Sequence, residues 1–282
     1  MSLEHFILTR FNLPTGGVEA RIRASETWLS NRWRLFEQYC VPSVASQTVT
    51  AFRWVIYFDP VSPAWLKEAI APYVAKGLFT AVFRTEVPTA ILVSDLRGLA
   101  QSDDGVLLTT NLDNDDGVAI DFVERLQSAV TFEDRRALYV TNGLIKSSTG
   151  VYLRRDPENA FCSVAEPWSD ARTSWSDWHI MLSRTMPVIE LDGAPGWLQV
   201  VHGENVSNRV RGRLVAPDAW NATFPGLLDD VTDPGLLRLL SDRFLLVPLR
   251  GVRDSTRTVL RRIALAVLGK DGMLQMKARL KR

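Results

Sequence analysis

The sequence predicts an α/β fold in which a mixed, mostly parallel sheet is flanked by helices, with a helical appendage at the C-terminal end. Short runs of aromatic and β-branched residues alternate with segments of helical periodicity through the first half of the chain. Such alternation is typical of parallel strands joined by crossover helices. The 282 residues are 46% hydrophobic and 23% charged, a composition that allows a globular domain with a large core.

Apolar periodicity defines each expected element of the first half. The expected strands are residues 5–9, 52–58, 80–85 and 105–112. The expected helices are residues 28–39, 62–76, 90–101 and 121–130. Pro63 stands in the first turn of the second helix and Gly77 follows its end, which are the positions that these residues favour.

The pattern changes after Arg136. We expect strands at residues 137–146 and 150–154, joined as a hairpin, and another strand at 197–201. The segment 159–178 is rich in Trp, Ser and acidic residues, and we interpret it as loop plus helix. Beyond Asn208 the chain becomes helical and basic.

Overall charge and short motifs exclude several function classes. A net charge of +1 does not favour nucleic-acid binding. Cys40 and Cys162 lack Cys-x-x-Cys spacing, so buried thiols in a reducing, cytoplasmic compartment are expected. No apolar run is long enough for a signal peptide or a membrane span. Dehydrogenase and P-loop kinase motifs are absent.

The sequence Leu112-Asp113-Asn114-Asp115-Asp116-Gly117 ends the fourth expected strand. Clustered carboxylates repel one another unless a cation offsets their charge. Aspartates at i and i+2 can reach one hard divalent ion, Mg²⁺ or Mn²⁺, whose open positions suit phosphate oxygens. An ordinary Asp/Asn/Gly surface turn is the alternative interpretation.

The chain resembles the bacterial putative rhamnosyltransferase family. The matching stretches are residues 6–12 (Phe-Ile-Leu-Thr-Arg-Phe-Asn), 28–47 (with Leu-Phe-Glu-Gln-Tyr-Cys-Val-Pro-Ser-Val), 52–59, 112–116 and 202–209 (His-Gly-Glu-Asn-Val-Ser-Asn-Arg). The resemblance extends to about Val210 and implies a GT-A type fold. It also implies a catalytic domain at 1–213, with a nucleotide-binding half at 1–117 and an acceptor half at 118–213. The helical basic region then covers 214–282.

The resemblance implies a metal-dependent glycosyltransferase that holds Mn²⁺ or Mg²⁺ through Asp113, Asp115 and His202. Its donor would be a nucleoside-diphosphate sugar, rhamnose or another deoxyhexose, and its acceptor a hydroxyl on a glycan or a lipid-linked glycan, as in polysaccharide biosynthesis. Direct displacement with inversion is expected. Asn111 stands where the family pattern has a basic residue, so the sugar or phosphate contact that the pattern implies is not expected from that position.

The donor-binding residues implied by the resemblance lie at strand ends, in the segment before the fourth strand and in one late loop. They are Thr9, Arg10, Asn12, Asp59, Arg97, Asp113 and Arg209. Arg209, with Arg211 and Arg213, would form a basic loop that closes over the diphosphate. The alternatives are surface ion pairs for Arg10 and Arg97, a simple turn at Asp59, and a solvated basic face for the late arginines.

An inverting transferase needs a carboxylate that takes the proton of the acceptor hydroxyl. Glu166 is the first candidate for this base, and Asp170 and Asp177 are competitors. Trp168 and Trp175 offer aromatic faces on which a sugar can stack.

The tail from Arg250 carries ten Lys or Arg against two Asp. One interpretation is peripheral contact with an anionic membrane at its inner face, where a lipid-linked acceptor is found. The other is a helix that packs on the domain with a solvated basic face.

Two other functions remain open. A nucleotidyltransferase of similar fold would need a glycine-rich basic loop directly after the first strand, and Thr15-Gly16-Gly17 comes late for that. A non-catalytic glycan-binding module would use the nine tryptophans and bind no nucleotide.

Overall fold

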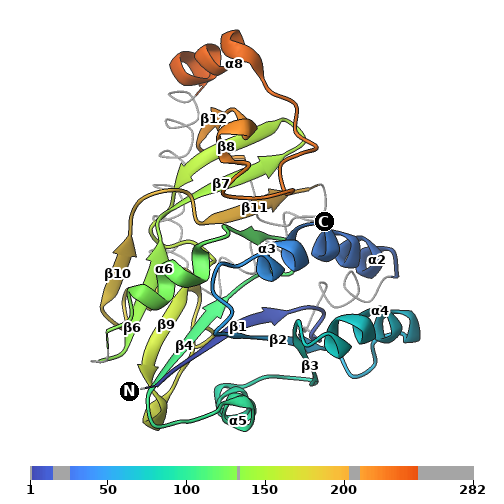
Figure 1. Ribbon diagram of the computed structural model, residues 1–282, viewed down its shortest axis with the longest axis vertical. Coiled ribbons are helices and arrows are strands. Elements are labelled where there is room, and N and C mark those ends of the chain that lie inside the picture. Colours follow the sequence, from blue (N-terminus) through green and yellow to red (C-terminus); the bar gives the residue numbers. More distant parts are fainter. Residues whose placement is uncertain (1, 15–25, 132–133, 203–209, 247–282) are drawn as a thin grey trace, which may run out of the picture.

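The computed structural model describes residues 2–14, 26–131, 134–202 and 210–246, whose strands form two sheets (Figure 1). The larger sheet has seven strands in the order β10-β6-β9-β4-β1-β2-β3. Its strands are β1 (Leu3–Arg10), β2 (Arg53–Phe58), β3 (Thr80–Phe83), β4 (Val106–Asn111), β6 (Arg136–Val140), β9 (Ser163–Pro167) and β10 (Val188–Leu191). The smaller sheet has the order β12-β8-β7-β11-β5. Its strands are β5 (Gly117–Val118), β7 (Asn142–Ser147), β8 (Gly150–Arg155), β11 (Trp197–Val201) and β12 (Arg213–Val215).

The helices of the first half connect the parallel strands. The α-helices are α2 (Glu26–Leu35), α3 (Val41–Ala45), α4 (Ala64–Ala75), α5 (Thr89–Leu99), α6 (Phe122–Ser128), α7 (His179–Leu182) and α8 (Gly235–Ser241). Shorter π and 3₁₀ segments are η1 (Phe36–Cys40), η2 (Trp168–Asp170), η3 (Pro217–Trp220) and η4 (Asp242–Leu246). No helix among these described segments is long and apolar enough to cross a bilayer.

The larger sheet confirms the expected fold class. β1 pairs in parallel with both β2 and β4, and β2 pairs in parallel with β3. Only β9 runs against its neighbours, β4 and β6. The order therefore reverses between β1 and β4, because β2 and β3 lie on one side of β1 and β4 on the other. In open α/β sheets ligands bind at the carboxyl ends of the strands at such a reversal.

Both faces of the larger sheet are buried, as a strand between two helical layers requires. On β1, Ile7 packs into the cluster that contains residues of α2, η1 and α4, while Phe6 and Leu8 pack on the other face with residues of α5. All three side chains are 0–1% exposed. Each contributes on the order of 1.5–3 kcal/mol through burial, which anchors β1 at the centre of the sheet.

A close approach between β7 and β11 aligns the smaller sheet. Gly143 lies opposite Trp197 in the parallel register of these strands. A Cβ atom on Gly143 would lie 1.9 Å from the Trp197 ring, so only glycine allows the indole to cover the strand. The indole stacks on Phe161 and donates a 2.9 Å hydrogen bond to the carbonyl of Val140. This contact places β11, and with it the cavity-facing residues of that strand.

The second half of the chain differs from the expected elements. The strand expected at residues 137–146 is two strands, because the chain leaves the larger sheet at Thr141 and enters the smaller one. Within residues 159–178, where loop plus helix was expected, the chain forms strand β9 and the short segment η2. The hairpin between β7 and β8 is confirmed.

The core also continues beyond residue 213, where the catalytic domain was expected to end. Leu214, Phe224, Leu227 and Leu228 are all buried in the main hydrophobic cluster. The described part of the expected helical region contains only the short helices η3, α8 and η4 after β12. Residues 247–282, and with them the basic tail, lie outside the described residues.

Candidate active site

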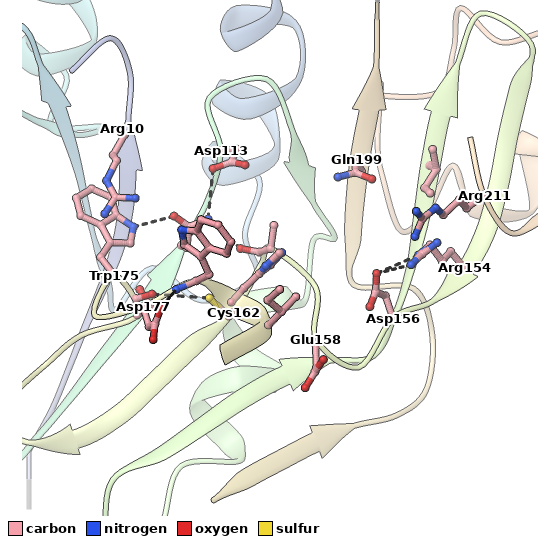
Figure 2. Close-up of a pocket in the computed structure, with 17 residues that line it drawn as sticks. Arg10, Asp113, Arg154, Asp156, Glu158, Cys162, Trp175, Asp177, Gln199 and Arg211 are labelled. Atoms are coloured by element: carbon pink, nitrogen blue, oxygen red, sulfur yellow. Dashed lines mark hydrogen bonds and ion pairs between the residues drawn. The ribbon is translucent and has the colours of Figure 1, made fainter. Parts of the chain in front are cut away.

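A cavity of about 600 Å³ opens at the reversal point of the larger sheet, between that sheet and the smaller one. Figure 2 shows Arg10, Trp175 and Asp177 on one side, Gln199, Arg154, Asp156 and Arg211 on the other, and Asp113 between them. The remaining lining residues are Asn111, Ile145, Glu158, Ala160, Cys162, Ser174, Trp178, His179 and Ile180. Both sheets thus contribute side chains to one space.

The acidic turn after β4 is held rigidly against both sheets. Asn114 donates from its amide nitrogen to the carbonyl oxygens of Arg10 and Phe11, at 3.2 and 2.7 Å. Asp116 is buried and accepts a 2.8 Å hydrogen bond from the backbone N–H of Val200 in β11. The turn therefore connects the end of β1 to the smaller sheet, and the interpretation as an ordinary surface turn does not fit it.

Asp113 faces the cavity, and Asp115 is buried behind it. The carboxylate oxygen Oδ2 of Asp115 lies 3.0 Å from His202 Nε2 and forms an ion pair with Arg32 of α2. Arg32 also donates to the side-chain oxygen of Asn114 at 3.2 Å. The structure thus brings Asp115 and His202 together as expected, and adds an arginine that the sequence did not indicate.

The three aspartates have different proton affinities. Burial, followed by the negative charges of Asp115 and Asp113, raises the pKa of Asp116 well above its usual range. Desolvation of its carboxyl group, followed by the charge of Asp115, also raises the pKa of Asp113, which lines the cavity. Burial acts in the same direction on Asp115, but the hydrogen bond from His202 and the charge of Arg32 outweigh it and lower the pKa. Negative charge is therefore concentrated on Asp115, at the point where cationic groups meet it.

The side chains near the turn fit a divalent ion in their chemistry. Two carboxylates and an imidazole suit Mg²⁺ or Mn²⁺, with the imidazole favouring Mn²⁺ slightly. They do not converge into a finished shell, since the described residues contain no group of three or more His, Cys, Asp or Glu arranged to hold a metal. Of these side chains, Asp115 and His202 are in contact with each other. Arg32 forms an ion pair with Asp115 Oδ2, the oxygen that a bound ion would share.

Asn111 organises the cavity where the family pattern led us to expect a basic residue. Its amide nitrogen donates to Asp113 Oδ1 at 3.3 Å and to the carbonyl of Ala160 at 2.8 Å. Its amide oxygen accepts a 2.7 Å hydrogen bond from the indole N–H of Trp175. The Arg10 guanidinium in turn lies 3.9 Å from the centre of that indole ring. One neutral amide thus positions an acid, an aromatic ring and, through the ring, a cation.

Of the other expected donor contacts, Thr9 is buried between strands. Its hydroxyl donates to the carbonyl of Leu112 and accepts from the indole of Trp54, at 2.8 and 3.0 Å. Both bonds hold the hydroxyl inside the sheet. The geometry therefore does not favour a contact between the Thr9 hydroxyl and a nucleotide-sugar donor. Arg97 is also remote, donating to the carbonyl of Trp168 and pairing with Asp103.

Asn12 and Asp59 form the loop beside β1 and β2. Asn12 donates to the hydroxyl of Ser62 at 3.0 Å and accepts from the backbone N–H of Asp59 at 3.0 Å. Asp59 uses one carboxylate oxygen to accept from the N–H of Val61. Neither residue lines the cavity, and the hydrogen bonds of both hold the loop. Arg209 lies outside the described residues, whereas Arg211 lines the cavity.

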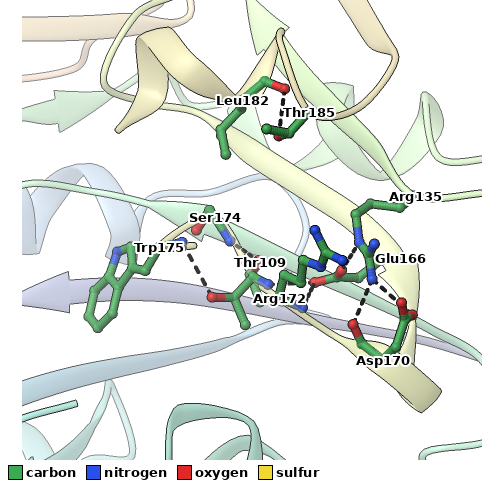
Figure 3. Close-up of polar contacts among 10 residues, drawn as sticks. Thr109, Arg135, Glu166, Asp170, Arg172, Ser174, Trp175, Leu182 and Thr185 are labelled. Carbon is green, nitrogen blue, oxygen red and sulfur yellow. Dashed lines mark hydrogen bonds and ion pairs between the residues drawn. The ribbon is translucent and has the colours of Figure 1, made fainter. Parts of the chain in front are cut away.

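Glu166 is not placed to act as a base in this cavity (Figure 3). It is 1% exposed and lies opposite Leu107, near the end of β4 that is remote from the acidic turn. One oxygen pairs with Arg135 at 2.5 Å, and the other accepts the backbone N–H groups of Arg172 and Thr173 at 2.9 and 2.6 Å. Both carboxylate oxygens are thus occupied by contacts that hold the segment after β9.

The structure adds cavity residues that sequence reasoning did not select. Gln199 lies on β11 between Leu198 and Val200, whose side chains are buried, so its amide faces the opposite way. That single polar residue in an apolar run was an available signal. Ser174, by contrast, carried none. Ser174 lines the cavity, and its buried hydroxyl has no hydrogen-bond partner among the described residues.

Comparison with known proteins gives one family. A family model described as "Putative rhamnosyl transferase" matches residues 4–214. No curated protein sequence matches the chain significantly.

Similar solved structures show only distant likeness. TarS 1-349 from S. aureus is 10% identical with a TM-score of 0.44; the match covers 71% of this chain and 60% of TarS 1-349. A putative nucleotide-diphospho-sugar transferase from Desulfovibrio desulfuricans G20 is 11% identical, with a TM-score of 0.35 and coverage of 71% and 81%. The inositol-1-phosphate CTP transferase from T. maritima is 10% identical, with a TM-score of 0.38 and coverage of 81% and 97%.

Proposed function

This chain belongs to the putative rhamnosyl transferase family and is a glycosyltransferase, and we propose that it transfers a deoxyhexose such as rhamnose from a nucleoside diphosphate to a glycan hydroxyl. The mixed sheet is the GT-A-like arrangement expected of such an enzyme. One observation carries the proposal: a cavity at the strand reversal combines a cation, an acidic turn and a second carboxylate. These are Arg10, Asp113 and Asp177.

The diphosphate end of the donor belongs beside the acidic turn. Arg10 is held in place by Trp175, and its guanidinium can pair with phosphate oxygens. Asp115 and His202, with Asp113, would hold a divalent ion there. When bound, that ion offsets the negative charge that builds on the departing diphosphate.

Asp177 is the carboxylate best placed to take the proton of the acceptor. It lines the cavity and is exposed, and one of its oxygens accepts the backbone N–H of Trp178 at 2.7 Å. Asp156 is instead held by the guanidinium of Arg154. In the proposed step Asp177 accepts the hydroxyl proton, the acceptor oxygen bonds to the anomeric carbon, and the bond from that carbon to the diphosphate oxygen breaks. Attack from the opposite face inverts the configuration.

Ser174 supports a sugar between these groups. Its hydroxyl is almost fully buried yet has no partner among the described residues, and an unpaired buried polar group costs free energy. A sugar hydroxyl in the cavity would satisfy it, so the site gains a hydrogen bond when a donor or acceptor is bound.

The test is turnover with a panel of UDP-, dTDP- and GDP-sugars, with Mn²⁺ or Mg²⁺ added, while the released nucleoside diphosphate is measured. The expected result is release of the diphosphate from a deoxyhexose donor. Release of pyrophosphate from a nucleoside triphosphate would identify a nucleotidyltransferase instead. Glycan binding with no nucleotide binding in calorimetry would leave a binding module and overturn the proposal.

A further inference from the structure

The cavity has lining residues to which the proposed donor contacts give no role, and together we call them the second wall. β8 contributes Arg154 and β11 contributes Gln199, and the segment after Asp177 adds Trp178 and His179. This wall begins beside the carboxylate that we assign as the base. A molecule lying on it would present a hydroxyl towards Asp177.

An exposed indole stands at the edge of this wall. Trp178 is 63% exposed although it lines the cavity, and it directly follows Asp177. A large aromatic side chain left in water gains free energy when an apolar surface covers it. The C–H face of a sugar ring is such a surface, and its hydroxyls remain free to contact polar neighbours.

The polar groups on this wall are neutral or paired. Burial lowers the pKa of His179, even though Asp156 and Glu158 nearby act to raise it, so the imidazole is neutral at pH 7. Arg154 is paired with Asp156 at 2.6 Å, and Glu158 accepts a 2.5 Å hydrogen bond from Ser183. Arg211 adds a second cation to this part of the cavity, where Asp156 and Glu158 supply two carboxylates. The wall therefore carries no excess of positive charge that would select a phosphorylated or acidic ligand.

Gln199 completes the wall with a neutral amide that can donate and accept at once. It lies beside Ile145 in the register of β7 and β11, and both side chains line the cavity. An amide, a neutral imidazole and an exposed indole together match a ligand that has many hydroxyls and no charge.

We propose that Trp178, His179 and Gln199 form the acceptor subsite of this cavity, and that it takes a neutral glycosyl unit. This inference rests on the proposed function for the identity of the reaction, but the binding that it predicts can be measured without turnover. The acceptor is then a sugar at the end of a glycan, stacked on Trp178, with one hydroxyl directed to Asp177.

The test is saturation-transfer NMR on the full chain in the presence of UDP or dTDP. The probes are methyl glycosides of neutral hexoses and deoxyhexoses, with methyl glucuronide and glucose 6-phosphate as charged comparators. The neutral glycosides should bind and the charged ones should not. Trp178→Ala and Gln199→Ala should each weaken that binding about tenfold. Gln101→Ala, an exposed glutamine outside the cavity, is the matched control and should bind like the unaltered chain.

Nucleotide affinity, measured by calorimetry, should be unchanged in both cavity variants, which also shows that they are folded. Preference for the charged probes, or equal binding by the variants and the control, would overturn the subsite. Absence of neutral glycoside binding to the unaltered chain would overturn it as well. If glycosides bind while no nucleotide does, the proposed transferase function fails and the subsite remains.

Discussion

At the scale of single residues, one oxygen of Asp115 is shared between two cationic partners. His202 approaches Oδ2 to 3.0 Å and Arg32 forms an ion pair with the same atom. The pair is almost fully buried, so its charges are poorly screened by water. A divalent ion can bind this oxygen only if the Arg32 guanidinium moves away from it. Arg32 is therefore either a competitor of the metal or a group that turns towards the diphosphate once the metal is bound.

Replacing Arg32 distinguishes these roles. If it competes, Arg32→Gln should tighten Mn²⁺ binding roughly tenfold, about 1.4 kcal/mol, because one positive charge and one competing bond are removed. Titration of Mn²⁺ by electron paramagnetic resonance measures this without turnover. Arg84→Gln, which breaks an ion pair with Asp95 away from the cavity, is the control. Unchanged or weaker Mn²⁺ binding by Arg32→Gln would contradict competition.

The contrast between Asp177 and Glu166 is a second residue-scale prediction. Asp177→Asn should lower kcat about 10²- to 10⁴-fold with little change in Tm, since it removes a proton acceptor on an exposed loop. Glu166→Gln should lower Tm instead, because a charge of the buried pair with Arg135 is lost. Steady-state kinetics and thermal unfolding of both variants provide the measurement. A large loss of kcat in Glu166→Gln at unchanged Tm would restore Glu166 as the base.

At the scale of elements, β1 carries a histidine in the interior of the sheet. His5 is 1% exposed; its Nδ1 accepts from the amide of Gln127 at 3.2 Å and its Nε2 donates to Thr110 at 2.9 Å. This arrangement requires the neutral ring, because a proton on Nδ1 would face a donor. Burial lowers the pKa of His5 to about 3. Below pH 6.5, His5 therefore becomes protonated in the unfolded chain but stays neutral in the folded chain.

The sign of the pH dependence follows from that difference. Stability from this residue should fall as pH decreases from 6.5, by about 1.4 kcal/mol per unit, and level off near the folded pKa. Urea unfolding of the unaltered chain and of His5→Gln between pH 7 and 5 gives the effect as the difference between the two. Subtraction removes the other titrating groups. The stability of the unaltered chain minus that of His5→Gln should fall as pH falls from 6.5 to 5, and a value that stays constant would mean that His5 is protonated equally in the folded and unfolded states.

At the scale of the whole molecule, the core joins the two sheets and includes residues from both ends of the described chain. Phe224 is fully buried in the same cluster as residues of β1, β2 and β11. Lys146 of β7 binds the carbonyl of Leu227 and pairs with Asp230, so the segment after β12 is attached by polar bonds as well. Residues beyond 213, where the catalytic domain is expected to end, therefore contribute side chains to the same core.

Truncation tests this directly. A chain that ends at residue 213 loses Leu214, Phe224, Leu227 and Leu228, and the loss of one such large side chain alone costs about 3–5 kcal/mol. It should be insoluble or show no cooperative thermal transition. A chain that ends at Leu246 keeps every described core residue and serves as the control. A cooperative transition at the original Tm in the shorter chain would show that the segment is dispensable.

The local pattern of residues determined the first half of the fold. Alternating apolar runs predicted β1, β2, β3, β4 and the helices between them, because the central strands β1, β2 and β4 are buried on both faces and are therefore nearly continuous apolar runs. The same pattern predicted the acidic turn at the end of β4. Since parallel strands of such a sheet end at one edge, Arg10 and Asp113 were expected together, and the structure places both on one cavity.

The second half and the role of each carboxylate were decided only by tertiary structure. β9 carries Glu166 among small residues, so its strand character depends on neighbours, β4 and β6, that are distant in sequence. Whether a carboxylate has a structural role or is available as a base depends on its partners. Glu166 is held in an ion pair with Arg135, while Asp177 faces the cavity. Spacing along the chain records which groups are present, but hydrogen bonds and burial across the fold determine which of them remain available for chemistry.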